Sequence, residues 1–196
     1  EYRAAAARGT FIFDDQVDAL TPQPVPFTQE QVDRADVLID GVEARGGTEI
    51  MQALQTAIHV PPDPSRLRTL VFLTDGSVGN EEQVLRMLAQ QLAGARVFTF
   101  GIGPAVNRYL LAKMAQLGRG TAEFLLPEQG LEEAITRFQN RVAFPLLTDL
   151  ELSCSAGQAR DVYPQPLPDL FQGQPVEVVG RYHGEEPARL RLAGQG

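Results

Sequence analysis

Residues 68–79 read R-T-L-V-F-L-T-D-G-S-V-G, and this stretch decides the fold. Its apolar run, Leu70 to Leu73, has the length of a strand and suits a sheet that is covered on both faces. The run stops at Thr74-Asp75-Gly76, a turn with a carboxylate at its tip. A helix pattern begins near Asn80, which with Gln83 forms a capping-box-like start. A buried strand that ends in an acidic turn and leads into a helix is the unit from which open α/β sheets are built.

Asp75 has two interpretations at this point. In open α/β sheets, ligands bind beyond the carboxyl ends of the strands, which is where Asp75 is expected to lie. The alternative is that Asp75 only closes a turn or caps the next helix, and the stretch by itself leaves both open.

Similar units precede and follow this stretch. Upstream, residues 10–13 form an apolar strand ended by Asp14 and Asp15, and Thr28 with Gln31 forms a capping box that opens a helix. Downstream, residues 95–103 and 121–126 predict buried strands, and Gly101 with Gly103 is expected to let the chain turn tightly. Residues 107–117 and 131–144 predict helices, the first capped by Asn107 and the second with Ile135 facing inward. Strands that alternate with helices at this length predict a three-layer, doubly wound α/β fold with a mostly parallel sheet.

The pattern changes at Pro145. Residues 147–154, 175–182 and 188–192 predict strands without intervening helices, and a proline-rich loop is expected at 163–173. Strands of this kind are typical of an antiparallel β-sandwich. We therefore divide the chain into an α/β domain, residues 1–144, and part of a β-sandwich, residues 145–196.

Composition excludes several functional classes. The net charge of the 196 residues is −8 and no cluster of Lys or Arg occurs, which argues against nucleic acid as a partner. The single Cys154 excludes an internal disulfide, and His59 with His183 lacks the spacing of metal ligands. No apolar run is long enough to span a membrane. Catalytic Ser/His/Asp order, a P-loop and zinc-ligand spacing are also absent, so an enzyme is not indicated.

The order and spacing of G-G-T at residues 46–48 and L-T-D-G at residues 73–76 resemble the von Willebrand factor type A domain. Three flanking stretches are similar to its inter-alpha-trypsin-inhibitor heavy-chain-like branch, including bacterial members. They read V-F-L-T-D-G-S-V-G-N-E, R-V-F-T-F-G-I-G-P-A-V-N-R-Y-L-L and D-V-Y-P-Q-P-L-P-D-L-F-Q-G-Q-P. The resemblance covers nearly the whole chain from Thr10.

The resemblance implies a metal-ion-dependent adhesion site above the sheet. Carried over by motif, its threonine is Thr48 and its aspartate is Asp75, and Ser77 could reach the ion through water. The ion would be Mg²⁺, or Mn²⁺ or Ca²⁺ in its place, held by oxygen ligands. The third element, D-x-S-x-S, does not occur in these 196 residues. Metal binding is therefore expected only where an upstream D-x-S-x-S motif is present.

In the family that motif ends the central strand of the sheet. Only nine residues precede the strand that begins at Thr10, so we expect the sheet to lack its central strand. The strand is expected to come from an upstream segment or from a neighbouring chain.

The implied function is a cation-dependent, adhesion-type module. Its partner would be a protein or extracellular-matrix ligand that offers an acidic side chain, and its location would be extracytoplasmic or in the cell envelope. The alternative is a metal-independent interaction scaffold in which Thr48 caps a helix and Asp75 shapes a turn.

Overall fold

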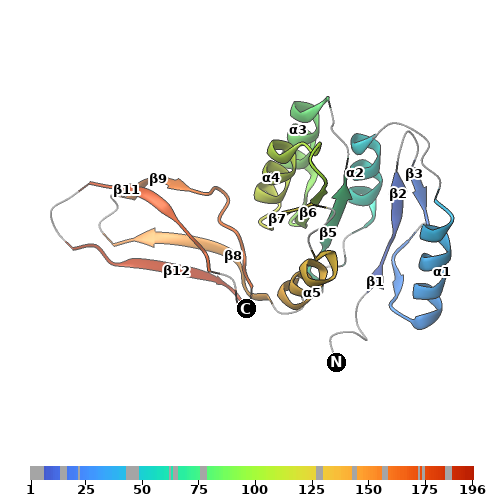
Figure 1. Cartoon of the computed structure of the whole chain (residues 1–196). Helices are drawn as coiled ribbons and strands as arrows, with labels where there is room; N and C mark the ends of the chain where they lie inside the picture. The colour runs from blue at the N-terminus through green and yellow to red at the C-terminus, as the bar shows by residue number, and fades with distance from the viewer. Residues whose placement is uncertain are drawn as a thin grey trace.

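The computed structural model describes most of the chain (Figure 1). The described residues are 7–13, 17–21, 23–42, 49–61, 63, 66–75, 79–126, 130–142, 145–155, 159–171, 173, 175–183 and 187–196. The helices are α1 (Gln29–Asp40), α2 (Ile50–His59), α3 (Glu81–Gln91), α4 (Arg108–Leu117) and α5 (Leu131–Val142). The strands are β1 (Ala7–Arg8), β2 (Phe11–Phe13), β3 (Val17–Ala19), β4 (Val25–Pro26), β5 (Thr69–Thr74), β6 (Arg96–Ile102), β7 (Ala122–Leu125), β8 (Pro145–Cys154), β9 (Ala159–Tyr163), β10 (Leu170–Phe171), β11 (Val179–Tyr182) and β12 (Leu190–Gln195).

A parallel sheet with strand order β5-β6-β7 forms the centre of the α/β part. Its register places Thr69 opposite Arg96 and Thr74 opposite Gly101. Between β6 and β7, Ile102 lies opposite Leu125. The carboxyl ends of the three strands therefore lie at one edge of the sheet, and their amino ends at the other.

Helices cover both faces of this sheet, as predicted. Successive side chains of a strand point to opposite faces. Val97 of β6 belongs to a core built with residues of α2, α3 and α4. On the other face, Phe98 and Phe100 contact Phe138 of α5, with ring centroids 5.3 and 5.0 Å apart. The α/β class is confirmed.

The hairpin of β2 and β3 is a separate antiparallel sheet. Within the described residues, β2 pairs only with β3 and β5 pairs only with β6. The two sheets still touch, because the rings of Phe13 and Phe72 stack with centroids 4.9 Å apart. On the other face of β5, Val71 and Leu73 are 44% and 48% exposed, so the expectation that the run at 70–73 is covered on both faces is wrong for these two residues.

Two helices are less buried than their sequence pattern predicted. Helix α1 begins after Thr28, whose hydroxyl accepts a 3.4 Å bond from the Gln31 N–H, so the Thr28 half of the predicted capping box is confirmed. The Gln31 side-chain oxygen accepts a 3.4 Å bond from Arg34. None of the residues of α1 is buried, however, and Ile39 is 54% exposed. On α5, Ile135 was expected to face inward but is 36% exposed. In both helices the periodicity predicted a buried face, but burial also needs a neighbouring element to cover that face.

Residues 145–196 form antiparallel sheets, as expected for part of a β-sandwich. One has the order β10-β8-β12 and the other pairs β11 with β9. The expected loop at 163–173 is partly wrong, since residues 170–171 form β10 and pair with β8. Pairing with a distant strand determines this short element, and the local proline pattern does not reveal it. Phe171 reaches the α/β part, with its ring centroid 5.6 Å from that of Phe98.

Candidate functional site

Asp75 follows β5 directly and is exposed at the carboxyl edge of the parallel sheet. The preceding residue, Thr74, is buried, so the chain emerges from the core at Asp75. This places the carboxylate where ligands bind in open α/β sheets.

The end of β6 lies beside Asp75 in the same edge. Gly103 has a φ of +93°, which favours glycine and turns the chain away from the strand. Gly101 has a different role from the tight turn that the sequence suggested. It lies within β6, and a Cβ there would lie 2.9 Å from the Phe124 ring and 3.0 Å from Leu111. Close packing therefore requires glycine at 101, and the turn requires it at 103.

The amino ends of α3 and α4 also lie at this edge, because each helix follows a strand that ends there. Asn107 caps α4, as predicted, by accepting a 3.0 Å bond from the Leu110 N–H. Its amide also donates a 2.7 Å bond to Glu81 in the first turn of α3. Sequence analysis missed Glu81, whose partner is 26 residues away.

Asn80 was expected to cap α3 with its side chain, and this is wrong. It occupies the N-cap position but its side chain makes no capping bond. Its backbone carbonyl instead accepts bonds from the N–H groups of Gln83 and Val84. The backbone at Asn80, with φ −123° and ψ 37°, differs from the extended conformation typical of a capping side chain.

The other predicted ligands fall outside the described residues. These are Thr48 and Ser77, and the acidic turn Asp14-Asp15 also lies outside them. Helix α2, which Thr48 was expected to cap, has Glu49 at its N-cap position without a side-chain bond. The structure thus places Asp75 and leaves its predicted partner Thr48 untested.

The donor set at this edge was compared with the needs of a hard cation. Mg²⁺ takes six oxygen ligands, several of which can be water. Among the described residues, no group of three or more His, Cys, Asp or Glu side chains could hold a metal ion. Asp75 supplies one carboxylate, so the described residues do not fit a complete cation site.

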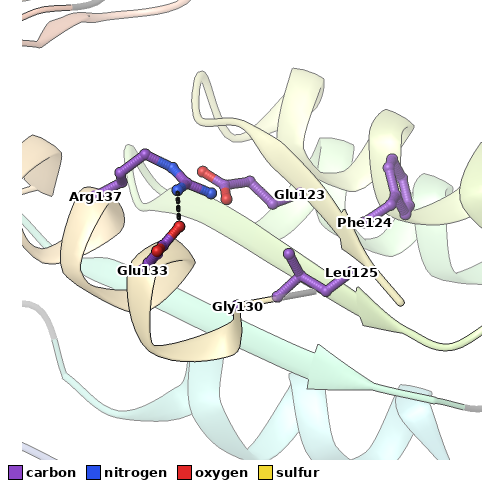
Figure 2. A pocket seen from close by; sticks show the side chains of 6 residues that line it. All are labelled: Glu123, Phe124, Leu125, Gly130, Glu133 and Arg137. Atoms are coloured by element: carbon purple, nitrogen blue, oxygen red, sulfur yellow. Dashed lines mark ion pairs between the residues drawn. The ribbon is translucent and has the colours of Figure 1, made fainter. Parts of the chain in front are cut away.

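A hollow of about 440 Å³ lies elsewhere, between β7 and the start of α5 (Figure 2). It is lined by Glu123, Phe124, Leu125, Gly130, Glu133 and Arg137. Arg137 lies 3.9 Å from Glu133, and both side chains are largely exposed. A second hollow, of about 470 Å³, lies between α3 and α4 and includes Leu85 and Lys113. Neither hollow is lined by Asp75.

In the part of the chain that the structure describes, no helix has the length and apolarity needed to cross a membrane.

Comparison with known proteins identifies the family. Residues 10–124, more than half of the chain, match the model of the von Willebrand factor type A domain. Mouse von Willebrand factor A domain-containing protein 5B1 is 28% identical over 171 residues, which cover 87% of this chain and 13% of that protein. Pig inter-alpha-trypsin inhibitor heavy chain H2 is 26% identical over 180 residues, covering 85% of this chain and 19% of that protein. The chain thus spans less than a fifth of either relative.

Solved structures show the same fold. The von Willebrand factor type A protein from Catenulispora acidiphila superposes with a TM-score of 0.68 at 19% identity, covering 93% of this chain and 47% of that one. Proximal thread matrix protein 1 of the mussel byssus, described with a zinc-occupied MIDAS motif, has a TM-score of 0.52 at 18% identity, covering 67% of this chain and 33% of that one. The family match, the relatives and the shared fold agree: the chain belongs to the von Willebrand factor type A domain family.

Proposed function

We propose that the chain is a protein-binding module that uses the carboxyl edge of the β5-β6-β7 sheet, with Asp75 at its centre. The observation that carries the proposal is an exposed carboxylate placed directly after strand β5, whose Phe72 and Thr74 are buried. Rigid strands position such a residue precisely, while its exposure leaves it open to a partner. Membership of a family of interaction domains supports binding over catalysis.

A cation would bind only to a site that contains more ligands than Asp75. Thr48 and Asp75 would contribute a hydroxyl and a carboxylate to a Mg²⁺ or Mn²⁺ ion, and an acidic side chain of the partner would complete its ligands. The D-x-S-x-S motif is needed as well, and residues 1–196 do not contain it. We therefore expect cation-dependent binding only when that motif is supplied, and metal-independent binding by the 196 residues alone.

The chemistry of the site points to the class of ligand. A cation with an open position binds a carboxylate, so the partner would present Asp or Glu on a protein or matrix surface. The relatives include a heavy chain of inter-alpha-trypsin inhibitor. We infer an extracytoplasmic place of action from this resemblance, which cell fractionation with an antibody against the chain would test.

Two proteins test the cation requirement. One is the 196-residue chain, and the other is a fusion in which a strand and helix bearing D-x-S-x-S precede residue 1. Mn²⁺ is titrated into each, and the loss of its free-ion paramagnetic resonance signal reports binding. The fusion should bind Mn²⁺ and the 196-residue chain should not. Asp75→Ala in the fusion should abolish binding, since it removes the one charged ligand that this chain provides.

Glu177→Ala is the matched control, because Glu177 is also exposed but lies in the C-terminal part. It should leave the Mn²⁺ titration of the fusion unchanged. Binding of the fusion and of the 196-residue chain is then measured, with and without Mg²⁺, on an array of peptides that each carry one glutamate. If the fusion binds peptides equally in both conditions and after Asp75→Ala, the adhesion-site proposal is wrong and a metal-independent scaffold is favoured.

A further inference from the structure

A cluster of charges around the buried Arg96 and Asp169 joins the C-terminal strands to the α/β part. Its members are Arg96 at the start of β6, Arg119 after α4, Asp149 in β8 and Asp169 just before β10. It lies at the amino edge of the parallel sheet, the edge opposite Asp75, because Arg96 is the first residue of β6.

Arg96 is the centre of the cluster. Its side chain is 3% exposed, which is unusual for a charged group unless it is paired. Its Nε donates to Oδ2 of Asp169, and its Nη1 donates a 2.5 Å bond to the carbonyl of Gly94. Its Nη2 lies 3.2 Å from Oδ1 of Asp149. The planar guanidinium therefore hydrogen-bonds to Asp169 and Gly94 and forms an ion pair with Asp149, in which Nη2 makes no hydrogen bond.

Asp169 is the counterpart on the C-terminal side, and its side chain is fully buried. Besides the bond from Arg96, its Oδ1 accepts a 2.9 Å bond from the N–H of Asp149. Its own N–H donates a 3.2 Å bond to the carbonyl of Arg119. One residue thus connects β6, the end of α4 and β8.

Asp149 reaches the cluster through an irregularity in β8. Its φ of +53° lies in the left-handed region, which is rare for a residue other than glycine inside a strand. The register between β8 and β12 shifts at this point, as in a β-bulge. Gly194 of β12 lies at the shift, and close packing requires glycine there, because a Cβ would lie under 3 Å from Leu150 and from the Thr148 carbonyl. The bulge directs both the N–H and the carboxylate of Asp149 to the cluster.

We propose that this cluster is an interlock that sets the orientation of the C-terminal sheet on the α/β layer and joins the two into one cooperative unit. The adjacent apolar contact between Phe98 and Phe171 supplies burial but little direction. Buried ion pairs often add little net stability compared with apolar residues of the same size. Asp169 makes hydrogen bonds with Arg96, Arg119 and the bulge residue Asp149, and this directional set is better explained by control of orientation.

The native Cys154 of β8 makes orientation measurable. It is the only cysteine, so a second cysteine at the exposed Gln91 at the end of α3 gives a defined pair of sites for nitroxide labels. Distances between the labels are measured by double electron–electron resonance. The labelled protein with the interlock intact should give one narrow distribution of distances between the labels. Its urea unfolding curve should show a single transition.

Asp149→Gly removes the carboxylate while keeping a residue that accepts the left-handed backbone. It should broaden the distance distribution. Asp169→Ala should broaden it further and lower the folding equilibrium constant by roughly a hundredfold or more, because it leaves Arg96 buried without its main partner. If Asp169→Ala fails to fold, Asp149→Gly decides the test, since Asp149 is 43% exposed.

Asp161→Gly is the matched control. Asp161 also has a left-handed φ, of 51°, and lies 3.6 Å from Arg181, but this pair is exposed on β9 and β11. It should leave the distribution narrow. A further variant, Arg96→Met with Asp169→Leu, replaces the charged pair with apolar packing that has no directional bonds. Its distance distribution should be broad. The interlock is refuted if the distance distribution of Asp149→Gly is as narrow as that of the parent protein. It is also refuted if Asp161→Gly broadens the distribution as much as Asp149→Gly does, or if the double variant, Arg96→Met with Asp169→Leu, gives a narrow distribution.

Discussion

Close packing at Gly101 predicts a large effect of a single methyl group at the edge that carries Asp75. A Cβ at this position would meet Phe124, Leu111 and Val106 at 2.9–3.0 Å, so these side chains must shift. We expect Gly101→Ala to lower the free energy of unfolding by about 1–3 kcal/mol, the usual cost of overpacking. Urea denaturation would measure it.

Gly79→Ala provides the comparison, since a Cβ there has no atom within 4 Å. Its effect should stay within about 0.5 kcal/mol, as for most surface substitutions. Equal stability of the two variants would show that the residues around Gly101 relax freely and that it has no packing role.

Whether a residue's role could be predicted from the sequence depends on how far along the chain its partner lies. The caps at Thr28 and Asn107 were predictable, because each side chain bonds to an N–H three residues later. Glu81 and Asp169 were not, because their partners are 26 and 73 residues away and only the fold brings them together. Arg96 did carry a signal in the sequence, as a charge at the start of an otherwise apolar strand, but not the identity of its partner.

One side of β5 pairs with no strand among the described residues, and this gives a prediction at the scale of an element. The Arg96 N–H donates a 2.8 Å bond to the Arg68 carbonyl, and alternate residues of a parallel strand bond to the same neighbour. Phe72 and Thr74 therefore direct their N–H groups to β6, whereas Val71 and Leu73 direct theirs to the unpaired side. In hydrogen exchange followed by NMR, Val71 and Leu73 should exchange faster than Phe72 by roughly tenfold or more.

Strand β6 serves as the internal reference for this experiment. It is paired on both sides, so the neighbouring amides of Val97 and Phe98 should both be protected. Equal protection of Val71 and Phe72 would mean that another strand covers β5. Sedimentation of the same sample would then show whether that strand belongs to a second copy of the chain.

Strand β6 was predicted well because burial on both faces gives a long apolar run, as at residues 97–100. The run at 70–73 also predicted a strand, but one face of it is half exposed at Val71 and Leu73. Helix α1 shows why a helix can be predicted while its packing cannot. Its cap and its periodicity are local, but an apolar position such as Ile39 is buried only if another element covers it, and Ile39 is 54% exposed. The two-residue strand β10 was missed because pairing with β8 alone defines it.

At the scale of the molecule, the interlock implies that the α/β layer depends on the strands that follow it. A chain that ends at residue 142 loses Asp149, Asp169 and Phe171, which leaves Arg96 without either carboxylate and Phe98 without the Phe171 ring. Breaking a buried pair costs about 3–5 kcal/mol, a large part of the 5–15 kcal/mol typical of a domain. We therefore expect the chain 1–142 to lose its cooperative urea transition, as followed by far-ultraviolet circular dichroism.

A chain that ends at residue 175 separates this effect from the mere loss of strands. It lacks β11 and β12 but keeps β8, β10 and all four charged residues of the interlock. It should keep one cooperative transition at a lower urea concentration than the 196-residue chain, because β12 no longer pairs with β8. If the chain 1–142 unfolds as cooperatively as the chain 1–175, and at the same urea concentration, then the α/β layer folds alone. The cluster would then attach the C-terminal strands without forming a single unit with them.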